Sequence, residues 1–140
     1  MQTEILAPAT VLIAWSIVML LWMALTRFPA MAKAGITMQS RRGGRGQDLQ
    51  GVIPDEVNWK AHNYAHLMEQ PTLFYAVTII LAMIGYSNDV LIAAWIYVGL
   101  RIAHSIWQAA INTIPVRLSL FLLSTLALAY LAVKALITAL

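Results

Sequence analysis

Four apolar stretches dominate this chain, at residues 5–27, 58–86, 90–111 and 115–138. Each is at least about 20 residues long, the length that an α-helix needs to cross the hydrocarbon core of a bilayer. Hydrophobic residues make up 61% of the 140 residues and charged residues only 11%, against about 25% charged in an ordinary soluble domain. The sequence therefore predicts an all-α membrane protein whose single domain is a bundle of four transmembrane helices.

The first stretch begins near the start of the sequence, where a secretory signal peptide is the competing interpretation. A signal peptide opens with basic residues and has an apolar core of about 7–15 residues. Here the opening residues include Glu4 and no base, and the apolar run extends from Ile5 to Thr26 before Arg27 closes it. We therefore expect a transmembrane helix. The chain has no cysteine, which excludes disulfides, thiolate metal sites and a cysteine nucleophile.

Residues 28–57 are expected to form a loop, because they combine glycine, proline and charged residues. The basic residues in and beside it are Arg27, Lys33, Arg41, Arg42, Arg45 and Lys60. Arg/Gly runs also occur in nucleic-acid-binding segments, but Asp48 and Glu56 make this surface mixed in charge, so we expect no nucleic-acid partner. Since short basic loops stay on the cytoplasmic side, the sequence predicts a cytoplasmic long loop and both termini outside.

The second stretch is predicted to be one helix from 58 to 86. Pro71 lies inside it and removes a backbone hydrogen bond, which predicts a kink. Neighbouring helices tolerate such a kink in a membrane. Asp55 or Asn58 can cap the start of this helix.

Polar and ionisable residues interrupt the two middle stretches. On the predicted second helix, His62, His66 and Glu69 fall at i, i+4 and i+7 and so share one stripe. Asn63 and Gln70 form the neighbouring stripe. An ionisable side chain at the bilayer centre costs at least about 2.5–3.5 kcal/mol, so it rarely lies there without a partner and a purpose.

The third stretch carries a matching polar face, formed by Arg101, His104, Ser105 and Gln108. With a rise of 1.5 Å per residue, Glu69 and Arg101 lie roughly 15 Å from the cytoplasmic ends of their helices, so they can share a level. Arg27 and Arg117 lie nearer the cytoplasmic ends of theirs. We expect a polar cavity open to the cytoplasm, with an excess of positive charge.

The same residues allow plainer interpretations. Glu69 and Arg101 could form an interhelical ion pair that binds no ligand, and His104 could be an ordinary buried histidine. Arg27 and Arg117 could anchor helix ends at the membrane interface.

Two further functional interpretations remain open at this point. His62, His66 and Glu69 could hold a metal ion, although the H-x-x-x-H spacing alone is a weak signal. Alternatively, the polar groups could specify helix packing in a non-enzymatic membrane module that binds lipid or assembles with other proteins.

The sequence resembles the MAPEG family, the membrane-associated proteins in eicosanoid and glutathione metabolism. Segment 63–75, with Leu-Met-Glu-Gln-Pro at 67–71, is similar to the family's glutamate-and-proline signature. Residues 101–105, Arg-Ile-Ala-His-Ser, are similar to its Arg-x-x-His-Ser/Thr motif. Arg27 and Arg117 stand where family arginines close the first helix and open the fourth. These four matches occur in order over essentially the whole chain.

The resemblance implies a homotrimer that binds glutathione between neighbouring subunits, near the cytoplasmic side, and a lipophilic second substrate. Glu69 would hold the glutathione amino group, and Arg27 and Arg101 its carboxylates. His104 would support the pocket. Arg117 would stabilise the thiolate, since a nearby guanidinium lowers the pKa of a thiol. The other residues expected at the binding site are His62, Asn63, His66 and Gln108.

Departures from the eukaryotic pattern indicate a bacterial-type member. His62 and His66 stand where glutathione-binding members have an arginine and an asparagine, and Gln108 replaces a tyrosine. Leu118 replaces a serine of the prostaglandin synthase branch. We therefore expect a glutathione transferase or peroxidase that acts on lipophilic electrophiles rather than a prostaglandin isomerase.

Overall fold

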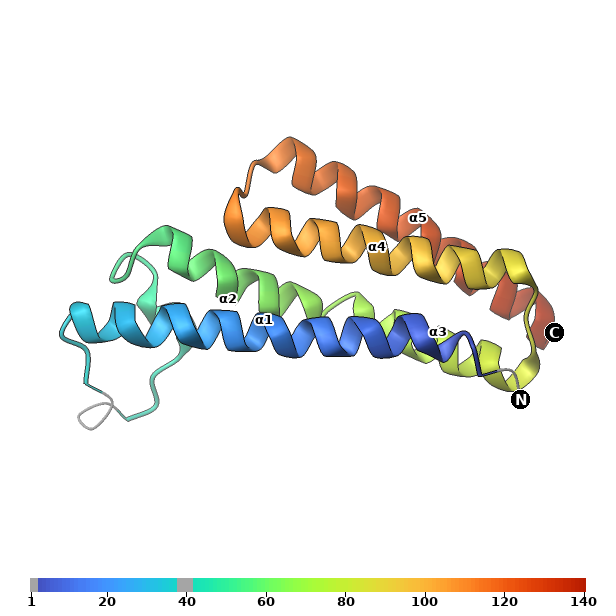
Figure 1. Ribbon diagram of the computed structural model, residues 1–140, viewed down its shortest axis with the longest axis horizontal. Helices are drawn as coiled ribbons and strands as arrows, with labels where there is room; N and C mark the ends of the chain where they lie inside the picture. Colours follow the sequence, from blue (N-terminus) through green and yellow to red (C-terminus); the bar gives the residue numbers. More distant parts are fainter. Residues whose placement is uncertain (1–2, 38–41) are drawn as a thin grey trace.

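The computed structural model describes residues 3–37 and 42–140, and Figure 1 shows that these residues form a bundle of long helices. The elements are α1 (Leu6–Lys33), the short 3₁₀ helix η2 (Gly46–Leu49), α2 (Asp55–Leu67), α3 (Pro71–Ile84), α4 (Asn88–Ala110) and α5 (Ile114–Ala139). The described ranges contain no strand. Four segments are long and apolar enough to cross a membrane, with α2 and α3 counted as one span. The predicted all-α membrane bundle is confirmed.

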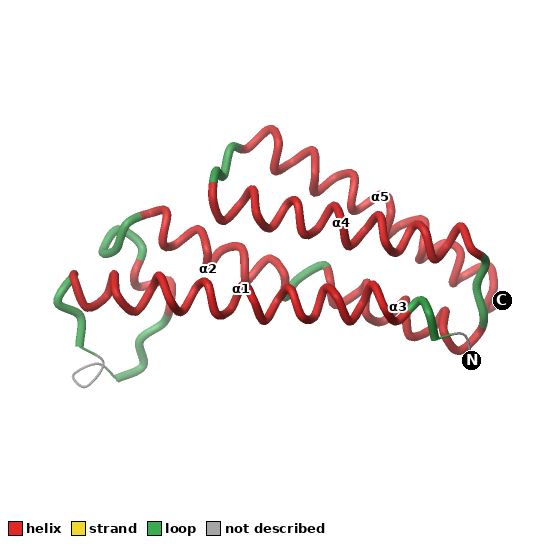
Figure 2. Tube along the Cα trace, viewed as in Figure 1, coloured by secondary structure: helices red, strands yellow, loops and turns green. Residues whose placement is uncertain are grey.

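The two ends of the bundle differ in character. Both termini and the α3–α4 turn lie at one end, and the long loop between α1 and α2 lies at the other (Figure 2). α1 runs alongside α2 and α3, α4 runs alongside α5, and α1 and α2 extend beyond the α4–α5 turn (Figure 1). The predicted loop base Arg41 lies outside the described residues.

Helix α1 continues beyond its expected end at residue 27, with Pro29 inside it, to Lys33. It stops where Gly35 adopts a left-handed backbone with φ of 73°. The Gly35 N–H donates to the Ala32 carbonyl at 3.1 Å, and the N–H of the next residue donates to the Met31 carbonyl at 3.0 Å. This pair of bonds is a Schellman motif, which glycine accommodates best because it has no Cβ. The end of α1 is therefore set by glycine rather than by proline.

The predicted second helix is two helices. α2 ends at Leu67, and α3 begins with Pro71 in its first turn, where the missing N–H costs no hydrogen bond. The expectation of one kinked helix over 58–86 was therefore wrong. Because Pro71 starts a new helix, the helix is interrupted between Leu67 and Pro71 instead of being bent.

The start of α2 also differs from expectation. The helix begins at Asp55 after the cap residue Pro54, and neither Asp55 nor Asn58 caps it through its side chain. Asn58 is buried and donates instead to the Leu49 carbonyl of η2 at 3.4 Å. This bond ties the long loop to the side of α2.

Gln70 links the break between α2 and α3 to the other half of the bundle. Its Nε2 donates to Thr125 Oγ1 of α5 at 2.9 Å, and its Oε1 accepts a hydrogen bond from the Tyr97 hydroxyl of α4 at 3.3 Å. Tyr97 in turn stacks on Phe74 of α3, with 4.4 Å between ring centroids. One amide at the break therefore connects three helices.

A second link between helices lies at the end that carries the termini. Lys134 Nζ on α5 is 3.0 Å from Asp89 Oδ2 on α4, and the Tyr130 hydroxyl donates to the same carboxylate. These contacts join the beginning of α4 to the last third of α5.

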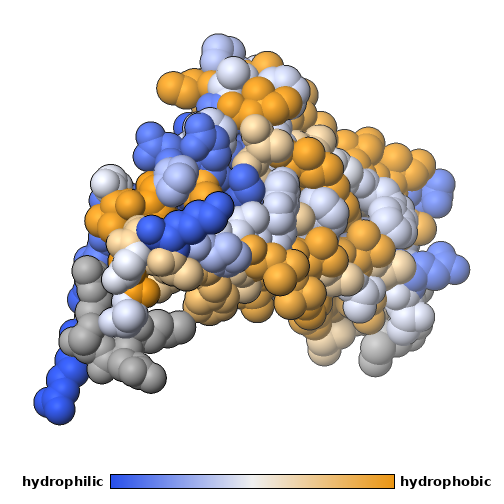
Figure 3. Space-filling view, turned by 60° about the vertical axis from the view of Figure 1, so that its left-hand side comes forward, coloured by the Kyte–Doolittle hydropathy of each residue, from blue (hydrophilic) through white to orange (hydrophobic). Residues whose placement is uncertain are grey.

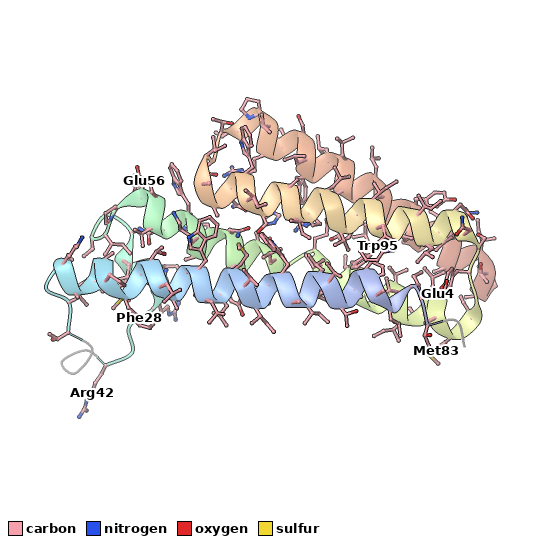
Figure 4. The ribbon with its side chains drawn as sticks, in the orientation of Figure 1. Glu4, Phe28, Arg42, Glu56, Met83 and Trp95 are labelled. Atoms are coloured by element: carbon pink, nitrogen blue, oxygen red, sulfur yellow. The ribbon has the colours of Figure 1, made fainter. Side chains whose placement is uncertain are left out.

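The sides of the helices are largely hydrophobic, and Figure 3 shows hydrophilic residues gathered around the loop end. Apolar side chains such as Leu25, Met83 and Ile137 are strongly exposed, and Figure 4 shows Met83 pointing away from the bundle near the opposite end. An apolar outer surface suits contact with lipid. The protein is therefore an integral, multi-pass membrane protein.

Replacing Gln70 by Leu tests the link at the helix break. We expect the Q70L variant to lose about 1–2 kcal/mol of unfolding free energy, because it removes two interhelical hydrogen bonds. Denaturant unfolding in detergent, followed by circular dichroism, measures the change. T138V is the matched control, since the Thr138 hydroxyl is exposed and bonds within its own helix. Equal effects of Q70L and T138V would contradict the assignment.

Candidate functional site

Arg101 on α4 is completely buried, with 0% of its surface exposed. Its Nη2 donates to His66 Nδ1 of α2 at 3.0 Å and more weakly to the His66 carbonyl at 3.4 Å. Since a guanidinium can only donate, Nδ1 of His66 must be unprotonated in this contact. Nε and Nη1 of Arg101 have no hydrogen-bond partner within residues 3–37 and 42–140. A positively charged group therefore lies inside the bundle, and two of its nitrogen atoms have no partner among the described residues.

Aromatic rings surround this guanidinium. His66 stacks on His104 with 4.7 Å between ring centroids and an interplanar angle of 24°, and Phe121 of α5 meets His66 edge-on at 5.5 Å. The Arg101 Cζ lies 5.8 Å from the Phe121 ring centroid and 6.0 Å from that of Tyr97. The ring faces stabilise the cation electrostatically. We call these five residues, Arg101, His66, His104, Phe121 and Tyr97, the arginine cluster.

Sequence reasoning missed Tyr97 and Phe121 as members of this cluster. Tyr97 stands four residues before Arg101 on α4, and Phe121 stands four residues after Arg117 on α5. Residues four apart lie on the same helix face, so the spacing could have identified both.

Glu69 lies in the turn between α2 and α3. Glu69 is exposed, and no carboxylate lies within 4.0 Å of Arg101 among the described residues, so the considered Glu69–Arg101 ion pair is not formed in this chain.

Arg117 is held by the α4–α5 turn. Its Nη1 donates to Asn112 Oδ1 at 2.6 Å, and Asn112 has a left-handed backbone with φ of 61°. Asparagine tolerates this conformation better than most residues. The turn therefore holds the guanidinium of Arg117, which is partly exposed.

Asn63 and Gln108 are buried with unsatisfied polar atoms. Asn63 is 1% exposed, and neither its Oδ1 nor its Nδ2 has a hydrogen-bond partner in the described part of the chain. The same holds for Gln108 Oε1 within those residues. Buried polar atoms are nearly always paired in folded proteins, so these positions require water, a ligand or a neighbouring chain.

Arg27 and His62 lie apart from the arginine cluster, at the loop end. Both line a cavity of about 290 Å³ between α1, the loop and α2, and His62 Nε2 is 3.2 Å from Gln50 Nε2. Arg27 also lines a second cavity of about 550 Å³. Neither cavity is lined by Arg101, His104, Glu69 or Arg117. The structure therefore brings part of the predicted site together and does not join all of it in one open cavity.

The histidines do not converge with carboxylates. Within residues 3–37 and 42–140, no group of three or more histidine, cysteine or acidic side chains is arranged to hold a metal ion. His62 is exposed and contacts Gln50, whereas His66 faces Arg101. The metal site considered for His62, His66 and Glu69 is therefore not formed among the described residues, because these side chains point to different places.

Comparison with known protein families identifies the chain. Residues 5–137 match the model of the MAPEG family. The chain belongs to the MAPEG family. The match runs from the start of α1 almost to the end of α5 and so includes every candidate site residue. Searches of curated proteins and of solved structures found no significant match.

The contact between His66 and Arg101 predicts a coupled effect on stability. We expect H66A to lower the unfolding free energy by about 1–3 kcal/mol, because it removes the side-chain acceptor of a buried guanidinium and leaves Nη2 only its weaker bond to the backbone carbonyl of residue 66. H62A, at an exposed position on the same helix, should change it by less than about 0.5 kcal/mol. The H66A/R101M double variant should recover most of the loss. Denaturant unfolding of the unaltered protein, H66A, R101M and the double variant measures the coupling. Additive effects would contradict the contact.

Proposed function

We propose that this protein is a glutathione-dependent transferase or peroxidase that acts on lipophilic electrophiles. MAPEG members generally use glutathione, and this chain belongs to the MAPEG family. The observation that carries the proposal is the buried guanidinium of Arg101, which keeps two donors without a partner in the described residues. Such a group, beside further unsatisfied polar atoms, is expected where a protein binds a polar anion.

The residues present fit the chemistry of glutathione. Glutathione carries two carboxylates, one ammonium group and a thiol, and is a net anion. Arg27, Arg101 and Arg117 supply three positive charges against the single carboxylate of Glu69. We assign Glu69 to the ammonium group and Arg27 and Arg101 to the carboxylates. Because Arg27 lies apart from the arginine cluster within one chain, this assignment places glutathione between neighbouring subunits, which supply the two arginines. The positions proposed to line the site are His62, Asn63, His66, His104 and Gln108.

Direct contact with Arg101 requires a movement, because the guanidinium has no exposed surface in the single chain. His66 is the side chain that covers it with a hydrogen bond. Rotation of His66 would free Nη2 and open Arg101 to a carboxylate. In the proposed complex, a carboxylate would take the place of His66 Nδ1 as the acceptor of this hydrogen bond.

Arg117 is the residue proposed to act in catalysis. Its guanidinium stabilises a thiolate more than a thiol, so it raises the fraction of the nucleophile present at neutral pH. In a transferase reaction the thiol loses its proton, the sulfur forms a bond to the electrophilic carbon, and a leaving group or a developing anion takes the electron pair. In a peroxidase reaction two thiols reduce a hydroperoxide to an alcohol and water and form a disulfide.

We further propose a homotrimer with the long loop in the cytoplasm and both termini outside. MAPEG proteins are typically trimers, and an exposed Glu69 with no ion-pair partner among the described residues suits a site completed by a neighbouring subunit. The basic residues of the loop support its cytoplasmic placement. The position of both termini at one end of the bundle agrees with this topology (Figure 2).

A non-enzymatic membrane module is the second candidate function. It is favoured by the complete burial of Arg101, which would then specify the packing of the helices and the oligomer. In that case E69Q would destabilise the oligomer without changing any small-molecule affinity.

Glutathione binding measured by calorimetry on detergent-purified protein tests the proposal. We expect millimolar or tighter binding, with a thiolate detectable by ultraviolet absorbance. R117A should lose the thiolate and lower turnover with a model electrophile by about 10²–10³-fold, because it removes an electrostatic stabiliser of the nucleophile. R117K should retain part of both.

R42A is the matched control for the arginine variants, since Figure 4 shows Arg42 pointing away from the helices. It should bind glutathione like the unaltered protein. If a folded oligomer binds no glutathione, the transferase proposal fails and the module takes its place.

A further inference from the structure

A cavity of about 550 Å³ lies between the second half of α1 and the loop that follows it. The residues of α1 that line it are Leu20, Met23, Ala24, Arg27, Phe28 and Met31. Their spacing places them on one face of the helix. Ile36 and Leu49 of the loop close the opposite side. The volume lies within the range of about 300–1,000 Å³ that is typical of small-molecule sites.

This cavity has apolar walls and a basic rim. Arg27 Nε is buried and has no hydrogen-bond partner in the described ranges. Arg45 also lines the cavity. The single acidic residue in the lining, Asp48, accepts a hydrogen bond from the Arg45 backbone N–H at 2.8 Å. Among the described residues, the lining therefore includes two arginines and one acidic residue.

The loop is built to pass close to Arg27. A Cβ at residue 46 would lie 2.9 Å from Arg27 Nη1, so glycine at this position lets the backbone approach the guanidinium. Arg27 therefore stands at the boundary between the 550 Å³ cavity and the 290 Å³ cavity, both of which it lines together with Met23 and Gly46.

We propose that the 550 Å³ cavity binds an anionic membrane phospholipid. One acyl chain lies along the apolar face of α1, and the phosphate lies between Arg27 and Arg45. A soluble anion gains nothing from the apolar walls, and a zwitterionic lipid presents no net charge to the basic rim. Basic pockets at the ends of transmembrane helices bind anionic head groups for this reason.

The location supports this occupant. The cavity lies where the hydrophobic sides of the helices give way to the hydrophilic loop end (Figure 3). Phe28 lines the cavity and is itself strongly exposed, so the apolar walls continue onto the outer surface of α1. A lipid can therefore enter sideways from the bilayer with its head group at the level of the loop.

Native mass spectrometry of the full chain tests the proposal. The protein is extracted in mild detergent, incubated with equal amounts of phosphatidylglycerol and phosphatidylcholine of the same acyl chains, and the lipids retained per chain are counted. We expect phosphatidylglycerol to be retained at least about fivefold more than phosphatidylcholine, given two basic residues at the rim.

Two pairs of variants locate the site without altering Arg27. A24F fills the apolar part of the cavity and should abolish the selective retention, whereas L25F adds the same ring at a neighbouring position that is 75% exposed and should leave it unchanged. R45Q should lower the preference for phosphatidylglycerol about fivefold, and R42Q, at the loop position that points away from the helices (Figure 4), should not.

Equal retention of the two lipids by the unaltered protein would overturn the proposal, as would selective retention that A24F and R45Q both leave intact. Because Arg45 is exposed in the loop, R45Q keeps the test valid if A24F fails to fold. Glutathione binding is measured on the same variants. Its absence from all of them would refute the proposed enzyme and would leave the lipid result unaffected.

Discussion

A guanidinium that lies inside the bundle, with no carboxylate paired to it in the part of the chain that the structure describes, is the constraint on which the rest of this structure depends. Burying a charge in a membrane protein is expensive unless nearby groups compensate it. Arg101 is compensated by the lone pair of His66 and by the faces of Tyr97 and Phe121. These groups come from α2, α4 and α5, so one charge determines how three helices meet. The compensation is incomplete, and the two remaining donors are what make the cluster a candidate site.

The break between α2 and α3 gives neighbouring residues different roles. His66 at the end of α2 turns inward to Arg101, while Glu69 in the connecting turn is exposed. Gln70 turns back into the bundle and bonds to α4 and α5. In a continuous helix Glu69 would share a stripe with His66. Because Pro71 starts a new helix, the carboxylate instead faces outward, where a ligand or a neighbouring subunit can reach it.

Much of the fold could be predicted from the sequence, because helix periodicity and length depend on local pattern. The four spans and the polar faces of the middle helices follow from spacing alone, whereas the sequence placed Glu69 opposite Arg101 and the structure places His66 there. The features that the sequence did not predict depend on how the long loop between α1 and α2 packs and on the break between α2 and α3. His62 is exposed beside Gln50 because the loop packs against α2 through Asn58, and no periodicity encodes that docking. The separation of Arg27 from the arginine cluster has the same origin.

The length of α1 has a consequence for how the protein meets its bilayer. Its 28 residues span roughly 42 Å, while a hydrocarbon core is about 30 Å thick. α1 and α2 extend beyond the α4–α5 turn at the loop end (Figure 1), whereas Arg101 lies within α4 and therefore outside this overhang. A change in bilayer thickness can be absorbed by the overhang and by tilt of α1. The protein can thus occupy membranes of different thickness while the packing around Arg101 stays the same.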